Sequence, residues 1–171
     1  MLSLRSLALI VLVALFTAAS TFPAPTSSVP DSCPVTKAAD QPFVPPPPYL
    51  SKAPTGMFWH GTDELWTLLH ADGTWAGLPH YTPHDPTFRQ KLFFWREGYD
   101  WRAEPQPPLT VTGRRLDAPA PPLMADRANN GYWDDWKSFM VTGINLPTLG
   151  CWEITGHYEG HDLSFLVWVS K

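Results

Sequence analysis

The chain has 171 residues, of which 44% are hydrophobic and 16% charged, and its formal net charge is −4 at neutral pH. This length and apolar content suffice for one well-buried domain but not comfortably for two. The acidic balance argues against a nucleic-acid-binding surface, which normally requires a basic patch.

The first 20 residues have the three-part pattern of a secretory signal peptide. Arg5 is followed by an apolar run over residues 7–16 and then by small residues. The apolar run is too short to span a bilayer comfortably. We expect cleavage after Ala19 or Ser20, which gives an exported protein that is secreted, periplasmic or held at the cell surface, without a membrane span. An uncleaved anchor is the alternative.

The next segment, residues 21–54, is dominated by Pro, Ser, Thr and Ala, and four consecutive prolines occupy positions 45–48. Proline removes backbone donors and favours extended polyproline geometry. We therefore expect a proline-rich tail or linker rather than a folded unit.

Residues 55–171 are expected to form one all-β domain. Short apolar runs rich in β-branched and aromatic residues alternate with Gly, Pro and polar turns, and no stretch has a sustained helical period. The strands expected before the C-terminal hairpin are residues 65–69, 74–76, 91–96, 109–116 and 138–146. The segments expected to be loops are residues 80–86, 118–122 and 129–131.

The last twenty residues predict a β-hairpin with a two-residue turn at Glu159-Gly160. This turn sets Tyr158 opposite His161 and so fixes all the other residue pairs of the hairpin. Because side chains alternate along a strand, one face of the hairpin is apolar and is expected to lie in the core. The residues on that face are Trp152, Ile154, Gly156, Leu163, Phe165, Val167 and Val169. The residues on the other face are Cys151, Glu153, Thr155, His157, Asp162, Ser164, Leu166 and Trp168.

About seven short strands punctuated by Pro and Gly indicate a β-sandwich. The segments 146–154 and 163–169, together with Leu65-Trp66 and residues 94–96, resemble a family of exported bacterial proteins of unknown function with immunoglobulin-like sandwiches. The resemblance covers roughly residues 57–169 and implies an immunoglobulin-like antiparallel β-sandwich. It implies no catalytic residues. The chain departs from antibody domains, because one of its two cysteines lies in the tail.

Those two cysteines, Cys33 and Cys151, are expected to form a disulfide, because export favours that bond over a metal site. The bond would clasp the tail across the outer face of the hairpin. The tail residues expected to cover Leu166 and Trp168 there are Phe43, Val44 and Tyr49.

Nine tryptophans are the most unusual feature of the composition. Trp66, Trp95 and Trp152 lie on predicted strands and are expected to be buried. The remaining candidates lie in or near predicted loops, where an aromatic face can stack on a sugar ring or anchor a protein partner. These possible ligand-contact residues are Trp59, Trp75, Trp101, Trp133 and Trp136. The alternative is that they cover the ends of a small core.

Two histidine pairs raise the possibility of a metal site, and one set of carboxylates raises that of a catalytic site. His80 and His84, and likewise His157 and His161, are four positions apart, and Asp85 and Asp162 follow them. The first pair brackets a proline and the second straddles a turn, so we favour loop polarity and a cross-strand pair of His157 with Asp162. Glu153 facing Asp134 or Asp135 would form a carboxylate pair of the glycosidase kind, but nothing fixes their separation.

No nucleophile motif occurs, and we assign no catalytic, cofactor-binding or metal-binding residue. The sequence therefore predicts a non-catalytic binding or structural module of the cell envelope with a protein or glycan partner. A carbohydrate-binding accessory module is one alternative, and a metal-dependent hydrolase is another.

Overall fold

A computed structural model describes residues 28–80 and 82–171, so the expected signal peptide lies outside the described residues. The described part of the chain is all-β, with ten strands and no helix. The strands are β1 (Met57–Thr62), β2 (Leu65–His70), β3 (Thr74–Ala76), β4 (Phe88–Trp95), β5 (Thr110–Arg115), β6 (Met124–Ala125), β7 (Asn129–Trp133), β8 (Lys137–Leu146), β9 (Gly150–Tyr158) and β10 (His161–Ser170).

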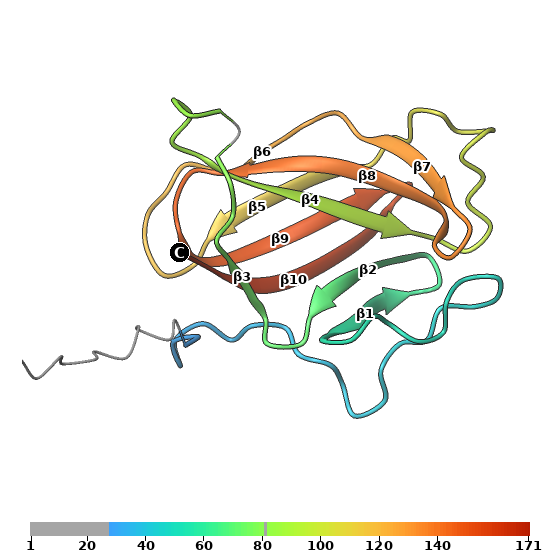
Figure 1. The fold of residues 1–171 in the computed structure, drawn as a ribbon, viewed down its shortest axis with the longest axis horizontal. Helices are drawn as coiled ribbons and strands as arrows, with labels where there is room; N and C mark the ends of the chain where they lie inside the picture. Colours follow the sequence, from blue (N-terminus) through green and yellow to red (C-terminus); the bar gives the residue numbers. More distant parts are fainter. Residues whose placement is uncertain (1–27, 81) are drawn as a thin grey trace, which may run out of the picture.

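The strands form two sheets that pack face to face (Figure 1). The larger sheet has the order β1-β2-β4-β8-β6, and β7 pairs with β8 beside β6. The smaller sheet has the order β3-β10-β9-β5. Neighbouring strands are antiparallel except β3 and β10, which run parallel. The prediction of an all-β fold is confirmed.

One apolar core lies between the sheets and takes side chains from both. Phe94 of β4 reaches so close to β9 that a Cβ on Gly156 would lie 2.6 Å from its ring, so only glycine fits there. The largest fully buried side chains of this core are Phe94, Met140, Ile144, Leu146, Trp152, Ile154, Tyr158, Phe165 and Leu65. Burial of these side chains is the main favourable contribution to folding.

The C-terminal hairpin has the predicted register. Tyr158 pairs with His161, Ile154 with Phe165 and Cys151 with Trp168. Glu159 and Gly160 both have positive φ values, of 48° and 86°, as a two-residue turn of this kind requires. The predicted core face is buried throughout, while most of the other face is partly or fully exposed.

The chain changes sheets between β2 and β3, which the sequence did not indicate. A turn closes where the Gly73 N–H donates to the carbonyl oxygen of His70, as expected. β3 then leaves the larger sheet and pairs with β10 of the smaller one. Trp75 is carried into the core by this crossing.

Three strands were not predicted. β6 lies between the two segments expected to be loop, residues 118–122 and 129–131. The expectation for residues 129–131 is wrong, because β7 pairs with β8 from Asn129 to Trp133. β1 was missed as well, although it pairs with β2 along its whole length. All three lie at the ends of the larger sheet, where the sequence pattern is weakest because only one side of each strand is paired.

Residues 28–54, which we name the strap, contain no strand but lie along the edge of both sheets (Figure 1). The Thr36 N–H donates to the Leu166 carbonyl oxygen, and the Thr36 hydroxyl accepts from the Leu166 N–H. These two bonds satisfy part of the free edge of β10.

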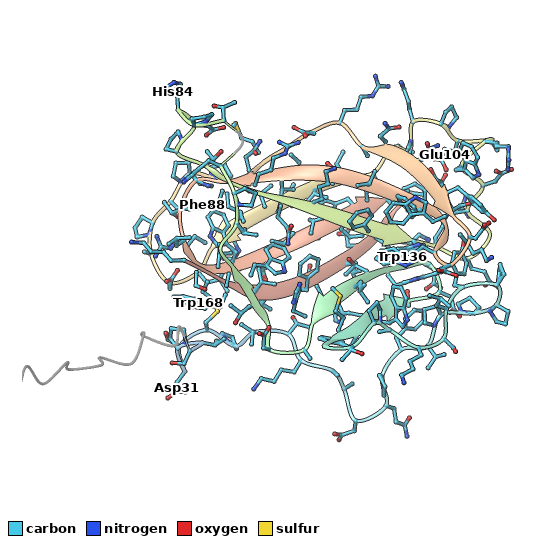
Figure 2. All side chains as sticks on the ribbon, in the orientation of Figure 1. Asp31, His84, Phe88, Glu104, Trp136 and Trp168 are labelled. Atoms are coloured by element: carbon cyan, nitrogen blue, oxygen red, sulfur yellow. A yellow bond between two sulfur atoms is a disulfide. The ribbon has the colours of Figure 1, made fainter. Side chains whose placement is uncertain are left out.

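The predicted Cys33–Cys151 disulfide joins the strap to β9. Figure 2 shows Trp168 beside this bond. The prediction that Phe43, Val44 and Tyr49 cover the outer face of the hairpin is nevertheless wrong. Trp168 packs against the buried cluster of Cys33, Val35 and Cys151. Phe43 and Tyr49 instead contact Trp66 on the larger sheet, and Val44 is 56% exposed.

Candidate functional site

An aromatic cluster covers the outer face of the larger sheet. β1, β2, β4 and β8 each place large side chains on this face, because alternate residues of a strand point the same way. The buried members of this cluster are Trp59, Trp66, Trp95 and Phe139. Burial of Trp66 and Trp95 was predicted from the sequence. The strap covers one side of the cluster, and the turn after β7 covers the other, where Trp95 Nε1 donates to the carbonyl oxygen of Trp136.

Two of the five candidate ligand-contact tryptophans are buried. Trp59 is 6% exposed and Trp75 is 4% exposed. Trp59 belongs to the outer aromatic cluster, where its ring meets Trp95 edge to face. Trp75 lies in the core against Phe165. The assignment of these two residues as exposed contacts is wrong, because Trp59 lies on the unpredicted strand β1 and Trp75 lies on β3, which crosses to the smaller sheet.

Two further candidates are partly buried by neighbouring side chains. The Trp101 ring stacks on Tyr132 at 6.2 Å and 25°, and the guanidinium of Arg102 lies 4.5 Å from the same ring. Trp136 contacts Phe93 and Trp95. Both rings are therefore already packed against neighbouring side chains.

Trp133 is the exposed member of the set, at 58%, and its neighbour Tyr132 is 42% exposed. We name Tyr132 and Trp133 the aromatic edge, because they lie on β7, which no other described strand flanks on its outer side. Trp133 rests against Trp136 and Phe139. Sequence reasoning missed Tyr132, although two apolar runs separated by a short polar turn at Asp134-Asp135 are a hairpin signal.

Polar contacts hold the aromatic edge in place. The Asn130 side chain donates to the carbonyl oxygens of Trp101 and Glu104, at 2.6 and 2.9 Å, and so ties β7 to the loop that follows β4. The Tyr132 hydroxyl donates to Asp134 Oδ1 at 3.2 Å. Figure 2 places Glu104 and Trp136 at the same end of the molecule, opposite His84.

Hydrogen bonds of the Tyr158 hydroxyl join the loop that follows β4 to the end of β9. The Tyr158 hydroxyl donates to Glu104 Oε2 at 2.6 Å and accepts from Arg96 Nε at 3.2 Å. Burial raises the pKa of Tyr99 to about 12, and burial together with the bond to Glu104 raises the pKa of Tyr158 further. Both phenols therefore stay protonated at neutral pH and act as hydrogen-bond donors that position the loop.

The histidine pairs do not converge. His80 Nδ1 lies 2.9 Å from the Thr87 carbonyl oxygen, while His84 is exposed at a loop tip (Figure 2). His157 Nδ1 lies 2.7 Å from Asp162 Oδ1, which confirms the predicted cross-strand pair. Within residues 28–80 and 82–171, no three His, Cys, Asp or Glu side chains gather closely enough to hold a metal ion.

The postulated carboxylate pair is not assembled either. Glu153 lies on the outer face of the smaller sheet, where its Oε2 accepts from Arg114 Nε at 2.6 Å. Asp134 and Asp135 lie in the turn between β7 and β8 of the other sheet. The glycosidase arrangement is therefore not supported.

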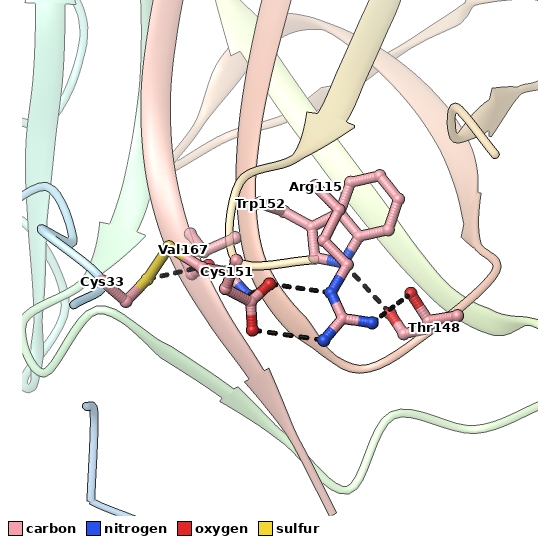
Figure 3. A network of polar contacts seen from close by, with 7 residues as sticks. Cys33, Arg115, Thr148, Cys151, Trp152 and Val167 are labelled. Atoms are coloured by element: carbon pink, nitrogen blue, oxygen red, sulfur yellow. Dashed lines mark hydrogen bonds and ion pairs between the residues drawn. A yellow bond between two sulfur atoms is a disulfide. The ribbon is translucent and has the colours of Figure 1, made fainter. Parts of the chain in front are cut away.

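A third polar network lies at the start of β9, beside the disulfide (Figure 3). Arg115 donates to both carboxylate oxygens of Asp117, at 2.7 and 3.2 Å, and to the Thr148 hydroxyl. The Cys151 N–H donates to Asp117 Oδ1. The bond from Arg115 lowers the pKa of Asp117. This arrangement fixes the disulfide-bearing end of β9.

No protein-family model matches this chain, and no curated protein matches it in sequence. Among the residues that the structure describes, no helix has the length and apolar character needed to cross a membrane.

Proposed function

We propose that the chain is an exported immunoglobulin-like module of the cell envelope that binds a protein partner through the aromatic edge. The strand order supports the fold. One sheet of an immunoglobulin constant domain has the order A-B-E-D, and the other contains C, F and G. If β2 and β3 are two halves of strand A, then β4, β5, β8, β9 and β10 take the places of B, C, E, F and G. β6 and β7 together take the place of D.

Two observations support export. Residues 1–20 have the composition of a signal peptide. The Cys33–Cys151 disulfide is of the kind that persists in oxidising compartments and is rare in the cytosol.

The observation that carries the binding proposal is the pair of exposed aromatic side chains on an unpaired strand edge. Tryptophan and tyrosine are enriched where protein interfaces gain most of their energy. The outward backbone groups of an edge strand also allow a partner strand to pair with it.

A protein partner fits this geometry better than a sugar. Tyr132 and Trp133 are neighbours on one strand, so their side chains point to opposite faces and cannot form one flat platform. The Trp101 ring is already in contact with Tyr132 and Arg102. The carbohydrate-binding alternative rests on Asn129 and Asp134 beside the aromatic edge, since polar side chains next to an exposed ring also suit a glycan.

A pull-down from an envelope extract, paired with a glycan array, tests the proposal. The bait is the purified processed protein, compared with Trp133→Ala and with Met124→Ala, which removes a 64% exposed apolar side chain from β6. We expect one protein to be retained by the wild type and by Met124→Ala, and lost with Trp133→Ala. Specific glycan binding that is lost with Trp133→Ala, with no protein retained, would support the carbohydrate alternative instead.

A further inference from the structure

A groove of about 500 Å³ lies between the strap, β1 and β10. Lys37, Ala39 and residues 41–43 of the strap form one wall, and residues 58–62 of β1 form the other. Leu163 of β10 contributes to the lining. This groove is separate from the aromatic edge, which belongs to β7 at the opposite border of the larger sheet.

The wall formed by β1 is an open strand edge. Among the described strands, β1 pairs only with β2. Because the turn between these strands has two residues, Thr62 and Leu65 form the first hydrogen-bonded residue pair of the hairpin. The alternation of bonding along an antiparallel pair then directs the backbone N–H and C=O of Trp59 and Gly61 away from β2. These groups face the side on which the groove lies.

The facing edge of β10 is already capped. Thr36 of the strap bonds both the N–H and the carbonyl oxygen of Leu166, and His60 Nε2 donates to the carbonyl oxygen of Ser164 at 3.1 Å. A chain that enters the groove therefore finds its main-chain partners on β1.

The lining also indicates which side chains the groove would accept. Phe43, Phe58 and Leu163 provide apolar contacts. Lys37 is the charged lining residue, and no carboxylate lines the groove, although the chain as a whole is acidic.

We propose that this groove binds an extended peptide segment that carries an acidic side chain and adds to β1 as an antiparallel or parallel strand. Main-chain hydrogen bonds to Trp59 and Gly61 supply the pairing, and apolar side chains of the peptide fill the space beside Phe43 and Phe58. The acidic side chain pairs with Lys37.

Fluorescence anisotropy with labelled synthetic octapeptides and the full processed protein tests this site. One peptide alternates valine with glutamate, and a second alternates valine with lysine. A third is the glutamate peptide with every second backbone nitrogen methylated. We expect the glutamate peptide to bind at least about tenfold more tightly than either of the others, because both charge and strand pairing contribute.

One variant locates the binding. Lys37→Glu should invert the preference between the glutamate and lysine peptides, because it reverses the charge that lines the groove. Lys52→Glu, at an exposed strap residue that does not line the groove, is the control and should leave the preference unchanged. Melting curves of each variant establish that it is folded.

Equal binding of the methylated and unmethylated peptides would overturn strand addition. Equal binding to the Lys37→Glu and wild-type proteins would overturn the location. The absence of binding by all three peptides at millimolar concentration would overturn the proposal as a whole.

Discussion

Asp117 illustrates how one charge organises the start of β9. Its carboxylate accepts two bonds from Arg115 and one from the Cys151 N–H, and the bond from Arg115 holds its pKa below the usual value. A carboxyl group with a lowered folded-state pKa stabilises the fold above its unfolded pKa of about 4. That stabilisation is lost as the pH falls through the lower folded-state value.

We therefore expect Asp117→Asn to lower the free energy of unfolding by about 2 kcal/mol at pH 7, since hydrogen bonds to a charged group are lost. The difference between variant and wild type should shrink as the pH falls below 4. Urea unfolding at a series of pH values measures both effects, and Asp40→Asn, in an exposed part of the strap, is the control. A difference that stays constant down to pH 2 would contradict this role.

At the residue scale, the sequence predicted burial only where it also predicted a strand. Trp66, Trp95 and Trp152 lie in long alternating runs, and all three are buried. Trp59 and Trp75 lie in β1 and in the three-residue β3, and their burial depends on the strap and on the crossing between sheets. These long-range contacts have no local signature in the sequence.

The C-terminal hairpin is the element that the sequence determined most fully, because a two-residue turn leaves one register. We expect Ile154→Asp to unfold the domain, since it buries an unpaired charge at a fully buried position. Thr155→Asp lies on the outer face, where Thr155 contacts the Ser164 hydroxyl, and should be tolerated. Thermal melting compares the two, and equal losses of melting temperature would contradict the assignment of the two faces.

The strap shows where sequence reasoning about elements stops. The disulfide partner could be predicted because the chain has only two cysteines. The positions of Phe43 and Tyr49 could not be predicted, because Trp66 and Trp168 both offer apolar surface and nothing in the sequence distinguishes them. The edge strands β6 and β7 were missed for a related reason, since strands with one paired side need less regular patterns.

We expect loss of the Cys33–Cys151 bond to destabilise the protein and to expose Trp168. A loop closed across 118 positions restricts the unfolded chain by roughly 4 to 5 kcal/mol in the entropy model. Melting curves with and without reductant, read by tryptophan fluorescence, measure the effect. The double variant Cys33→Ser and Cys151→Ser is the control, because reductant should not change its melting temperature. Unchanged wild-type melting after complete reduction would contradict the stabilising role of the bond.

At the scale of the whole molecule, the sandwich places its exposed aromatic side chains at one border. β7 holds Tyr132 and Trp133, while the loop after β4 supports them through Asn130 and the hydrogen bond from Tyr158 to Glu104. The all-β architecture followed from the strand and turn pattern. The aromatic edge did not, because it requires β7 to pair with β8 and leave its other side open.

The central claim is that this border contacts a partner protein, and site-specific photo-crosslinking in the producing cell tests it most directly. A benzophenone amino acid replaces Trp133 in one strain and Met124, exposed on the separate strand β6, in another. We predict one discrete crosslinked protein adduct from position 133 and none from position 124. The absence of an adduct at position 133, or the same adducts at both positions, would contradict the claim.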